Sequence, residues 1–367
     1  MPISEPIAYD ASCEQLEPHE AETSEDLLKT LLEISDTTFK DTGLGLRSVH
    51  AKSHGLLRGT LTVLDLSGPL AQGLFAQAGR RFPVQIRLST TPGDLLDDRV
   101  STPRGFAMKV MEVEGERLPG SEAATTQDFL LVNGPTFLAP NAHKFLGGLK
   151  LLAATTDKLP RLKRAFSTVL QGTEKALEAV GGESGTLKSL GGHPETHILG
   201  ETFFSCVPFL YGRHMAKWQV VPVAPSLLDL KDQLVDLKDK PDGLRAAVLD
   251  YFASQGGEWD LRVQLCTDLA AMPIEDASVR WPEDQSPFIS VARISVPSQC
   301  SWSEELSAQM DDGLAFSPWN GLAAHRPLGS INRARRIAYA GSAHARSARG
   351  RCPVHEPGTP ESVALDG

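Results

Sequence analysis

The sequence predicts an α+β protein whose core is an antiparallel sheet or barrel of about eight strands. Two observations lead to this prediction. Strand-length segments of alternating or continuous apolar residues come in two groups along the chain. Within the first group, most neighbouring segments have no helical stretch between them that is long enough for a crossover connection. A barrel of this size can enclose one ligand, although a barrel alone assigns no function.

The first group of strands lies within residues 56–135, and the second within residues 201–297. In the first group we expect strands at LLRGTLTVLDL, PVQIRLST, GFAMKVMEVEG and DFLLVNGP. In the second group we expect them at ETFFSCVPFLYG, HMAKWQVVPV, WDLRVQLCTD and SPFISVARISVP. Each segment is bounded by the turn-forming or polar residues that usually end a strand.

Helical patterns flank and divide the strands. Leucines at helical spacing predict a helix from Ser24 to Phe39 with Ser24 as its N-cap, and a second helix from Asn141 to Leu170. Residues 171–200 are rich in Gly, Ser and Thr and predict a loop, and the chain beyond Trp302 reads as helical and irregular. We therefore divide the chain into an N-terminal arm and helix (1–40), a core (41–346) and a loose C-terminal tail (347–367).

Composition excludes several classes of function. The net charge of −10 argues against nucleic acid as a partner, because phosphate binding requires a basic surface. No apolar run is long enough for stable membrane insertion, and the acidic N-terminus lacks the features of a secretory signal. A basic stretch at 158–164 could touch a membrane surface, but we expect a solvated helix face there. Five scattered cysteines without a C-x-x-C pair predict neither a zinc site nor disulfides, and so a cytoplasmic protein.

Candidate ligand-binding residues cluster near the C-terminal end, in the segment RARRIAYAGSAHAR. Arg335 and Tyr339 stand four residues apart, and Arg346 follows seven residues later, so a helix would place all three near one face. A guanidinium one turn away favours the phenolate form of a tyrosine, and tyrosine is a known axial ligand of haem iron. The rival interpretations of this arginine-rich stretch are a nucleic-acid patch and a solvated helix face.

Four motifs upstream complete a pattern. Arg47 and His50 stand in RSVHAK, Arg87 and Ser89 in IRLST, and Asn133 in VNGP, with TPRGFAMK between the last two. Each motif alone is weak, but together with RRIAY all five occur in the order in which catalases carry them. The chain therefore resembles the catalase superfamily, and in particular its shortened catalase-related haem peroxidase group, which includes allene oxide synthase-type domains.

The resemblance implies a role for each residue. His50 would be the distal histidine above the haem, Ser89 would contact its imidazole, and Asn133 would be the distal amide that orients the peroxide. Tyr339 would be the proximal axial ligand of the haem iron, with Arg335 as its charge partner. The propionates of haem b would bind Arg47, Arg87 and Arg346.

The resemblance also implies a fold and an activity. We expect a catalase-like antiparallel eight-stranded β-barrel with flanking helices, lacking the C-terminal helical domain of larger catalases. We expect a haem-dependent hydroperoxidase, active in oxidative stress, that reduces hydrogen peroxide or organic hydroperoxides through an oxidised iron-oxo intermediate. A second peroxide or an organic electron donor would complete turnover, and the protein would be a homo-oligomer.

Three positions bear on the substrate. Gly134 stands where the family has threonine, and Leu138 where it has a second phenylalanine, so the pocket could admit larger hydroperoxides. Val49 precedes His50, as in true catalases, whereas an allene oxide synthase has threonine there. Two alternatives stay open: rearrangement of a lipid hydroperoxide, and a haem sensor or carrier without turnover.

Overall fold

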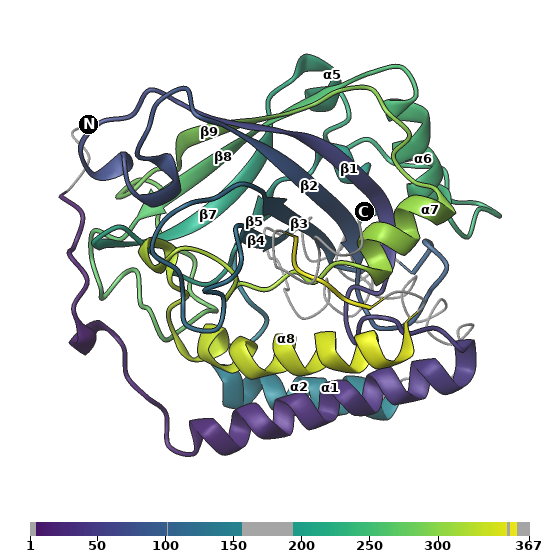
Figure 1. The fold of residues 1–367 in the computed structure, drawn as a ribbon, viewed down its shortest axis with the longest axis horizontal. Helices are drawn as coiled ribbons and strands as arrows, with labels where there is room; N and C mark the ends of the chain where they lie inside the picture. The colour runs from purple at the N-terminus through teal and green to yellow at the C-terminus, as the bar shows by residue number, and fades with distance from the viewer. Residues whose placement is uncertain (1–4, 101, 156–193, 351–352, 358–367) are drawn as a thin grey trace, which may run out of the picture.

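The fold is a closed antiparallel barrel with helices packed around it. The computed structural model describes residues 5–100, 102–155, 194–350 and 353–357. Its strands hydrogen-bond in the order β5-β4-β3-β2-β1-β9-β8-β7, and a further pairing between β5 and β7 closes the ring of eight. The short strand β6 extends the sheet at β7. Figure 1 shows the barrel above a layer of three helices.

Every pairing in the sheet is antiparallel. The predicted antiparallel barrel of eight strands is therefore confirmed. The segment expected as one strand at 201–212 divides into two, β5 and β6, and only β5 belongs to the closed ring. The strands are β1 (Lys52–Val63), β2 (Arg81–Thr90), β3 (Arg104–Val110), β4 (Gln127–Val132), β5 (Phe203–Phe204), β6 (Phe209–Tyr211), β7 (His214–Pro222), β8 (Gly257–Leu265) and β9 (Ile289–Val296).

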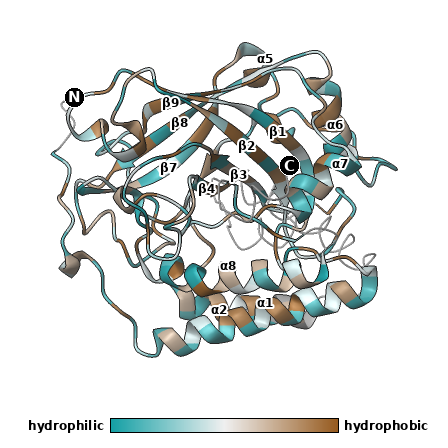
Figure 2. Ribbon diagram, in the orientation of Figure 1, coloured by the Kyte–Doolittle hydropathy of each residue, from teal (hydrophilic) through white to brown (hydrophobic). Residues whose placement is uncertain are grey.

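Side chains that alternate along each strand divide the barrel into an interior and an outer face. On β3, Phe106, Met108 and Val110 are buried in the main hydrophobic core, and Gly105 and Ala107 therefore face outward. The interior is filled by large rings rather than left open: it contains Phe75, Phe129, Trp218 and Trp259, among others. Figure 2 shows the apolar residues that run along the barrel strands.

Three helices cover one side of the barrel: α1 (Glu20–Thr42), α2 (Ala142–Thr155) and α8 (Ser330–Arg349) (Figure 1). The helices α1 and α8 approach closely, because Gly341 leaves room for the side chain of Leu28. A Cβ at Gly341 would lie 2.4 Å from a methyl carbon of Leu28. The helix predicted at 141–170 is confirmed as far as Thr155, and its remainder lies outside the described residues, as does most of the predicted loop at 171–200.

The prediction that Ser24 is an N-cap is wrong. Helix α1 begins at Glu20, and its N-cap is His19, which has a left-handed backbone (φ 59°). Ser24 lies inside the helix and donates its hydroxyl to the carbonyl of Glu20 at 2.8 Å. Glu20 and Glu22 in the first turn favour the earlier start, because carboxylates stabilise the positive end of a helix dipole.

The remaining helices are shorter. Between β7 and β8 lie α5 (Pro225–Leu228) and α6 (Gly243–Phe252), for which the sequence had suggested no element. After β9 come α7 (Glu304–Leu306) and a π-helix, Ser307–Asp312, which together form one irregular helical segment. This agrees with the irregular helical region expected beyond Trp302.

An ion-pair network ties the N-terminal arm to α8. Arg333 on α8 contacts the carboxylates of Glu14 at 2.8 Å, Glu20 at 2.6 Å and Glu275 at 3.0 Å. Burial opposes the charge of Arg333, but its hydrogen bonds to the carboxylates of Glu20 and Glu275 outweigh this effect and raise the pKa of the guanidinium. The arm is thus bound along the helix layer of its own chain.

Two other expectations concern the described residues only. The sequence predicted no disulfide framework. The cysteines that the structure describes, Cys13, Cys206, Cys266 and Cys300, are free. Among the helices that the structure describes, none is both long and apolar enough to cross a bilayer.

We predict that Gly59→Ala destabilises the barrel and Gly147→Ala does not. A Cβ at Gly59 would lie 2.6 Å from the main-chain oxygen of Ser295 on the neighbouring strand, so the β1–β9 seam must shift. At Gly147 on α2 a Cβ meets nothing within 4 Å, and alanine favours the helix. Thermal denaturation should show a loss of roughly 1–3 kcal/mol for the first variant and no loss for the second. Equal melting temperatures for both variants would contradict the close packing of this seam.

Candidate functional site

The imidazole of His50 lies at the edge of the barrel's outer face, in the loop between α1 and β1. Its backbone is left-handed (φ 54°), which is uncommon for a residue with a Cβ and costs roughly 1–3 kcal/mol unless the surroundings hold it. Its Nδ1 lies 3.2 Å from the hydroxyl oxygen of Ser89 on β2. Two residues that are far apart in the sequence are thus brought together as expected.

Burial keeps His50 neutral. Removal from water, together with the positive charges of Arg87, Arg335 and Arg47, lowers the pKa of the imidazole to about 3. The imidazole is therefore uncharged at neutral pH. If Nδ1–H donates to Ser89, Nε2 carries a lone pair that can accept a proton.

A glycine allows the imidazole to approach the sheet. A Cβ at Gly105 on β3 would lie 2.8 Å from Nδ1 of His50 and 2.8 Å from the hydroxyl oxygen of Ser89. Any side chain at this position would therefore displace the histidine. The motif TPRGFAMK contains this glycine.

The outer face of three neighbouring strands forms a floor that begins at His50. Ser89, Gly105 and Val132 stand side by side on β2, β3 and β4. The next row of the same face contains Arg87, Ala107 and Leu130. Gly105 and Ala107 on β3 have small side chains or none, so no bulky group stands in the middle of this surface. Near the second row lies a small hydrophobic cluster that contains Leu56, Met310, Leu314 and Phe316.

The register places Val132, not Asn133, on the face of His50. Val132 is the direct partner of Gly105, so their side chains share a face, and the next residue along the chain turns the other way. The amide of Asn133 accepts a hydrogen bond from the backbone N–H of Arg104 at 2.8 Å and donates to Glu201 at 2.5 Å. The structure thus brings the Asn133 amide to Arg104 and Glu201. The motif located the right strand end, but a shift of one residue exchanges the faces.

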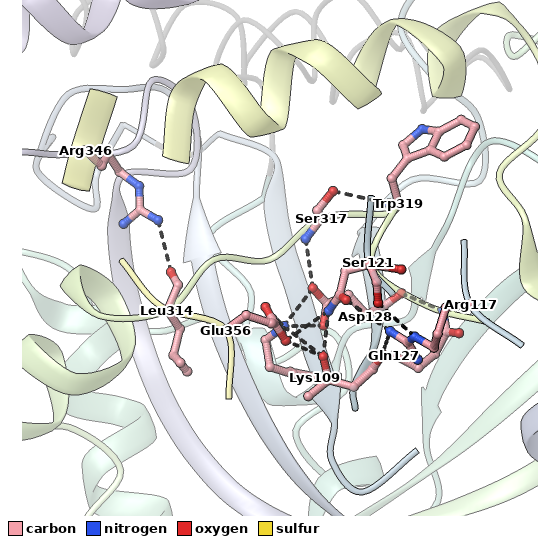
Figure 3. A network of polar contacts seen from close by, with 12 residues as sticks. Lys109, Arg117, Ser121, Gln127, Asp128, Leu314, Ser317, Trp319, Arg346 and Glu356 are labelled. Atoms are coloured by element: carbon pink, nitrogen blue, oxygen red, sulfur yellow. Dashed lines mark hydrogen bonds and ion pairs between the residues drawn. The ribbon is translucent and has the colours of Figure 1, made fainter. Parts of the chain in front are cut away.

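The three arginines expected at the propionates come together in space. Arg47 from the loop before His50, Arg87 from β2 and Arg346 from α8 all reach the segment 311–314. Arg87 Nε donates to a carboxylate oxygen of Asp311 at 2.5 Å. Arg47 and Arg346 each donate to the main-chain oxygen of Asp311, at 2.7 and 2.8 Å. Each also donates to the main-chain oxygen of Leu314, at 3.0 Å. Figure 3 shows the contact between Arg346 and Leu314.

This cluster, which we call the arginine cluster (Arg47, Arg87 and Arg346), is rich in positive charge. Burial, followed by the repulsion of Arg87, lowers the pKa of Arg346 to about 10, and burial with Arg346 and Arg87 lowers that of Arg47. Burial raises the pKa of Asp311, but Arg87 and Arg47 outweigh it and keep that carboxyl ionised. The sequence gave no signal for Asp311, because it belongs to none of the motifs.

One face of α8 is directed at this site. Arg335, Tyr339, Ser342 and Arg346 fall close together around the helix, at about 100° per residue. Three of these four side chains contact other parts of the structure. Arg335 lies over the ring of Phe137, Ser342 lies 3.5 Å from Ser48 two residues before His50, and Arg346 joins the arginine cluster. Tyr339 is therefore on the face that passes the His50 loop.

A buried charge cluster closes the far end of the floor (Figure 3). Lys109 on β3, two residues beyond Ala107, contacts Asp128 at 2.8 Å and Glu356 at 2.8 Å. Thr126 and Asn320 also donate to Glu356. The described part of the C-terminal segment, 353–357, is thus bound to the barrel, which differs from the loose tail expected at 347–367. Sequence reasoning missed this because a single glutamate in a polar segment carries no pattern.

The single positive charge of Lys109 can neutralise only one of the two carboxylates, those of Asp128 and Glu356. Burial raises the pKa of Asp128, Lys109 lowers it and Glu356 raises it again, with a net rise to about 7. The carboxylates hold the pKa of Lys109 above its ordinary value despite burial. The ammonium therefore keeps its charge, and one carboxyl takes up a proton as the pH falls through about 7.

The comparisons with known proteins show the fold. Residues of the chain superpose on a fungal catalase with a TM-score of 0.58 and 20% identity, over 85% of this chain and 60% of that one. Catalase A from Saccharomyces cerevisiae gives 0.61 and 17%, over 96% and 69%. A bacterial catalase gives 0.58 and 18%, over 96% and 67%. The chain thus has a catalase-like fold and spans about 60–69% of the length of these structures.

Sequence comparison gives no corresponding match. No model of a protein family matches the chain, and no curated protein matches it. At this level of identity the superpositions show the architecture alone, so the chemistry must be argued from the residues.

We predict that the charge cluster makes the protein less stable as the pH rises from 5 to 7. The pKa of Asp128 is raised in the folded chain, to about 7 from an ordinary value of 3.8, so its contribution is fully present below pH 3.8 and is lost progressively as the pH rises to 7. Glu356→Gln removes one of the two anions, so thermal melting across this range should depend less on pH than in the unchanged protein. Asp26→Asn, which breaks an exposed ion pair with Lys150, is the control and should leave the pH dependence as it is. An unchanged pH dependence in Glu356→Gln would contradict the assignment.

Proposed function

We propose that the chain binds haem b in this site and acts as a haem-dependent hydroperoxidase, a catalase or peroxidase that reduces hydrogen peroxide or organic hydroperoxides. The observation that carries the proposal is the convergence of three separate groups on one floor. These are the neutral His50–Ser89 pair, the arginine cluster, and the face of α8 that carries Tyr339.

The residues present fit haem. Arg47, Arg87 and Arg346 would hold its two propionates, since guanidinium groups suit carboxylates. Gly105 and Ala107 place no bulky side chain on this face of the sheet, and the imidazole of His50 packs against Gly105. His50 would face one side of the ring. Tyr339 would be the iron ligand on the other, and Arg335 on the same helix face would favour its anionic form.

The chain's own part in the chemistry is proton transfer. When bound, haem supplies a ferric iron that a hydroperoxide can oxidise by two electrons. His50 Nε2 would accept the proton from the inner oxygen of the hydroperoxide and return it to the outer oxygen, so that water or an alcohol leaves. Ser89 would hold the tautomer in which Nε2 is free, by accepting a hydrogen bond from Nδ1.

A specific observation favours a second candidate function. Val132 and Leu130 give the floor beside His50 an apolar surface, and Val132 offers no hydrogen bond to a peroxide. Such a surface suits an organic hydroperoxide, so rearrangement of a lipid hydroperoxide is the second candidate. Rearrangement consumes no reducing donor, so product analysis with a fatty-acid hydroperoxide separates the two functions. A non-catalytic haem sensor or carrier would show neither product. A homo-oligomer in the cytoplasm stays a prediction from the sequence.

The first test is the absorption spectrum of the haem-reconstituted protein. We expect a high-spin ferric spectrum of the tyrosinate type, and Tyr339→Phe should abolish its tyrosinate features. Tyr9→Phe is a matched control, because Tyr9 lies in the N-terminal arm and hydrogen-bonds Glu14. Absence of haem binding, or a spectrum unaffected by Tyr339→Phe, would overturn the proposed site.

The second test concerns His50. We expect His50→Ala to lower the rate of peroxide consumption by roughly 10²–10⁴-fold, the usual contribution of a positioned acid–base group. Haem binding should be retained, and the exposed His344→Ala should have no effect. Because the pKa of His50 is about 3, the imidazole is neutral above pH 4, and the rate should show no titration of this group between pH 5 and 9. A step near pH 6.5 that disappears in His50→Ala would contradict the buried, neutral imidazole.

A further inference from the structure

The arginine cluster already contains a carboxylate of the protein itself. Asp311 places one carboxylate oxygen 2.5 Å from Arg87 Nε and 3.5 Å from Arg47 Nη1. Its other oxygen accepts hydrogen bonds from the hydroxyls of Ser53 at 2.6 Å and Ser307 at 3.2 Å. The side chain of Asp311 is 13% exposed. The carboxylate of Asp311 thus accepts three hydrogen bonds and makes a further ion pair with Arg47.

The arginines also hold the segment that carries Asp311. Asp311 lies in the last turn of the π-helix Ser307–Asp312, and its main-chain oxygen accepts hydrogen bonds from Arg47 and Arg346. Carbonyl groups at the end of a helix lack partners within the helix, so arginines are suited to bind them. π-helical turns are rare and occur often at functional sites. The segment 307–314 is therefore attached to the barrel and to α8 through the same cations that would bind a ligand.

No buried nitrogen of the three arginines is left without a partner among the described residues. A ligand carboxylate that binds the same donor groups therefore competes with Asp311 or with the main chain of 311–314. Coulomb repulsion acts in the same direction, because a ligand anion beside an ionised Asp311 is opposed by a like charge.

We propose that Asp311 is an internal occupant of the arginine cluster that competes with the carboxylates of the ligand, so that binding proceeds by exchange of one carboxylate for another. In the ligand-free chain, Asp311 neutralises part of the cluster and holds the 307–314 segment. In the bound chain, ligand carboxylates take its place on Arg87 and Arg47. The identity of the ligand as haem rests on the proposed function, whereas the exchange itself requires only a carboxylate.

The exchange can be tested without haem. In Asp311→Ala the arginines lose their anion, and the melting temperature should fall. Added acetate should restore it in this variant and not in the unchanged protein, whereas acetamide or chloride at equal concentration should not. If acetate gives no more recovery than chloride, the cluster is not a carboxylate site and the proposal is overturned.

The competition is tested with haem. Asp311→Asn should bind haem roughly tenfold or more tightly than the unchanged protein in a spectrophotometric titration, because the competing charge is removed. Haem dimethyl ester, whose propionates are blocked, should bind both proteins equally. Asp260→Asn is a matched control on another part of the barrel. The carboxylate of Asp260 accepts hydrogen bonds from Arg293 Nε at 2.6 Å and from the hydroxyl of Ser290 at 2.7 Å. This control should leave haem affinity unchanged.

Ser307→Ala gives a milder variant if loss of Asp311 prevents folding. It removes one hydrogen bond from Asp311 and should change haem affinity in the same direction by a smaller factor. Unchanged or weaker haem binding in Asp311→Asn or Ser307→Ala would overturn the competition. If the unchanged protein binds no haem, the proposed function fails, and the acetate experiment still decides the exchange.

Discussion

The closure of the barrel is the constraint on which the rest of the structure depends. Because β5 pairs with both β4 and β7, the ring has no open edge and its strands cannot slip against one another. On β3 the register places Phe106 and Met108 in the core, and Gly105, Ala107 and Lys109 on the outer face. A slip of one residue would put the lysine among aromatic rings, where an unpaired charge is too costly. The geometry of the floor thus follows from the packing of the interior.

Opposite charges join the C-terminal third of the chain to this floor. The barrel and α8 provide buried cations, and the segments after β9 provide the carboxylates of Asp311 and Glu356. Each contact lies where charge must be neutralised, because a buried cation without a partner is strongly destabilising. In the proposed exchange, a carboxylate ligand would use the arginine cluster and would replace the contact that Asp311 makes there.

The site combines a strained backbone with a neutral base. His50 holds a left-handed conformation next to a glycine that leaves no space for a side chain, and burial, together with the surrounding arginines, lowers the pKa of its imidazole and keeps it uncharged. The arginines thus have two effects at once: they create a site for anions and they suppress protonation of the histidine.

The sequence by itself determined the class of fold and selected several residues of the candidate site. Alternating strands predicted eight barrel strands, because each must bury one face, and the ordered motifs selected His50, Ser89 and the three arginines, which the structure brings together. Tertiary structure alone decided which side chains share a face of the sheet and which carboxylates of the C-terminal segments contact the barrel. Val132 rather than Asn133 lies beside His50 because the strand register, which depends on partners far away in the sequence, sets the face. Asp311 and Glu356 carry no local pattern, and only the folded chain brings them to Arg87 and Lys109.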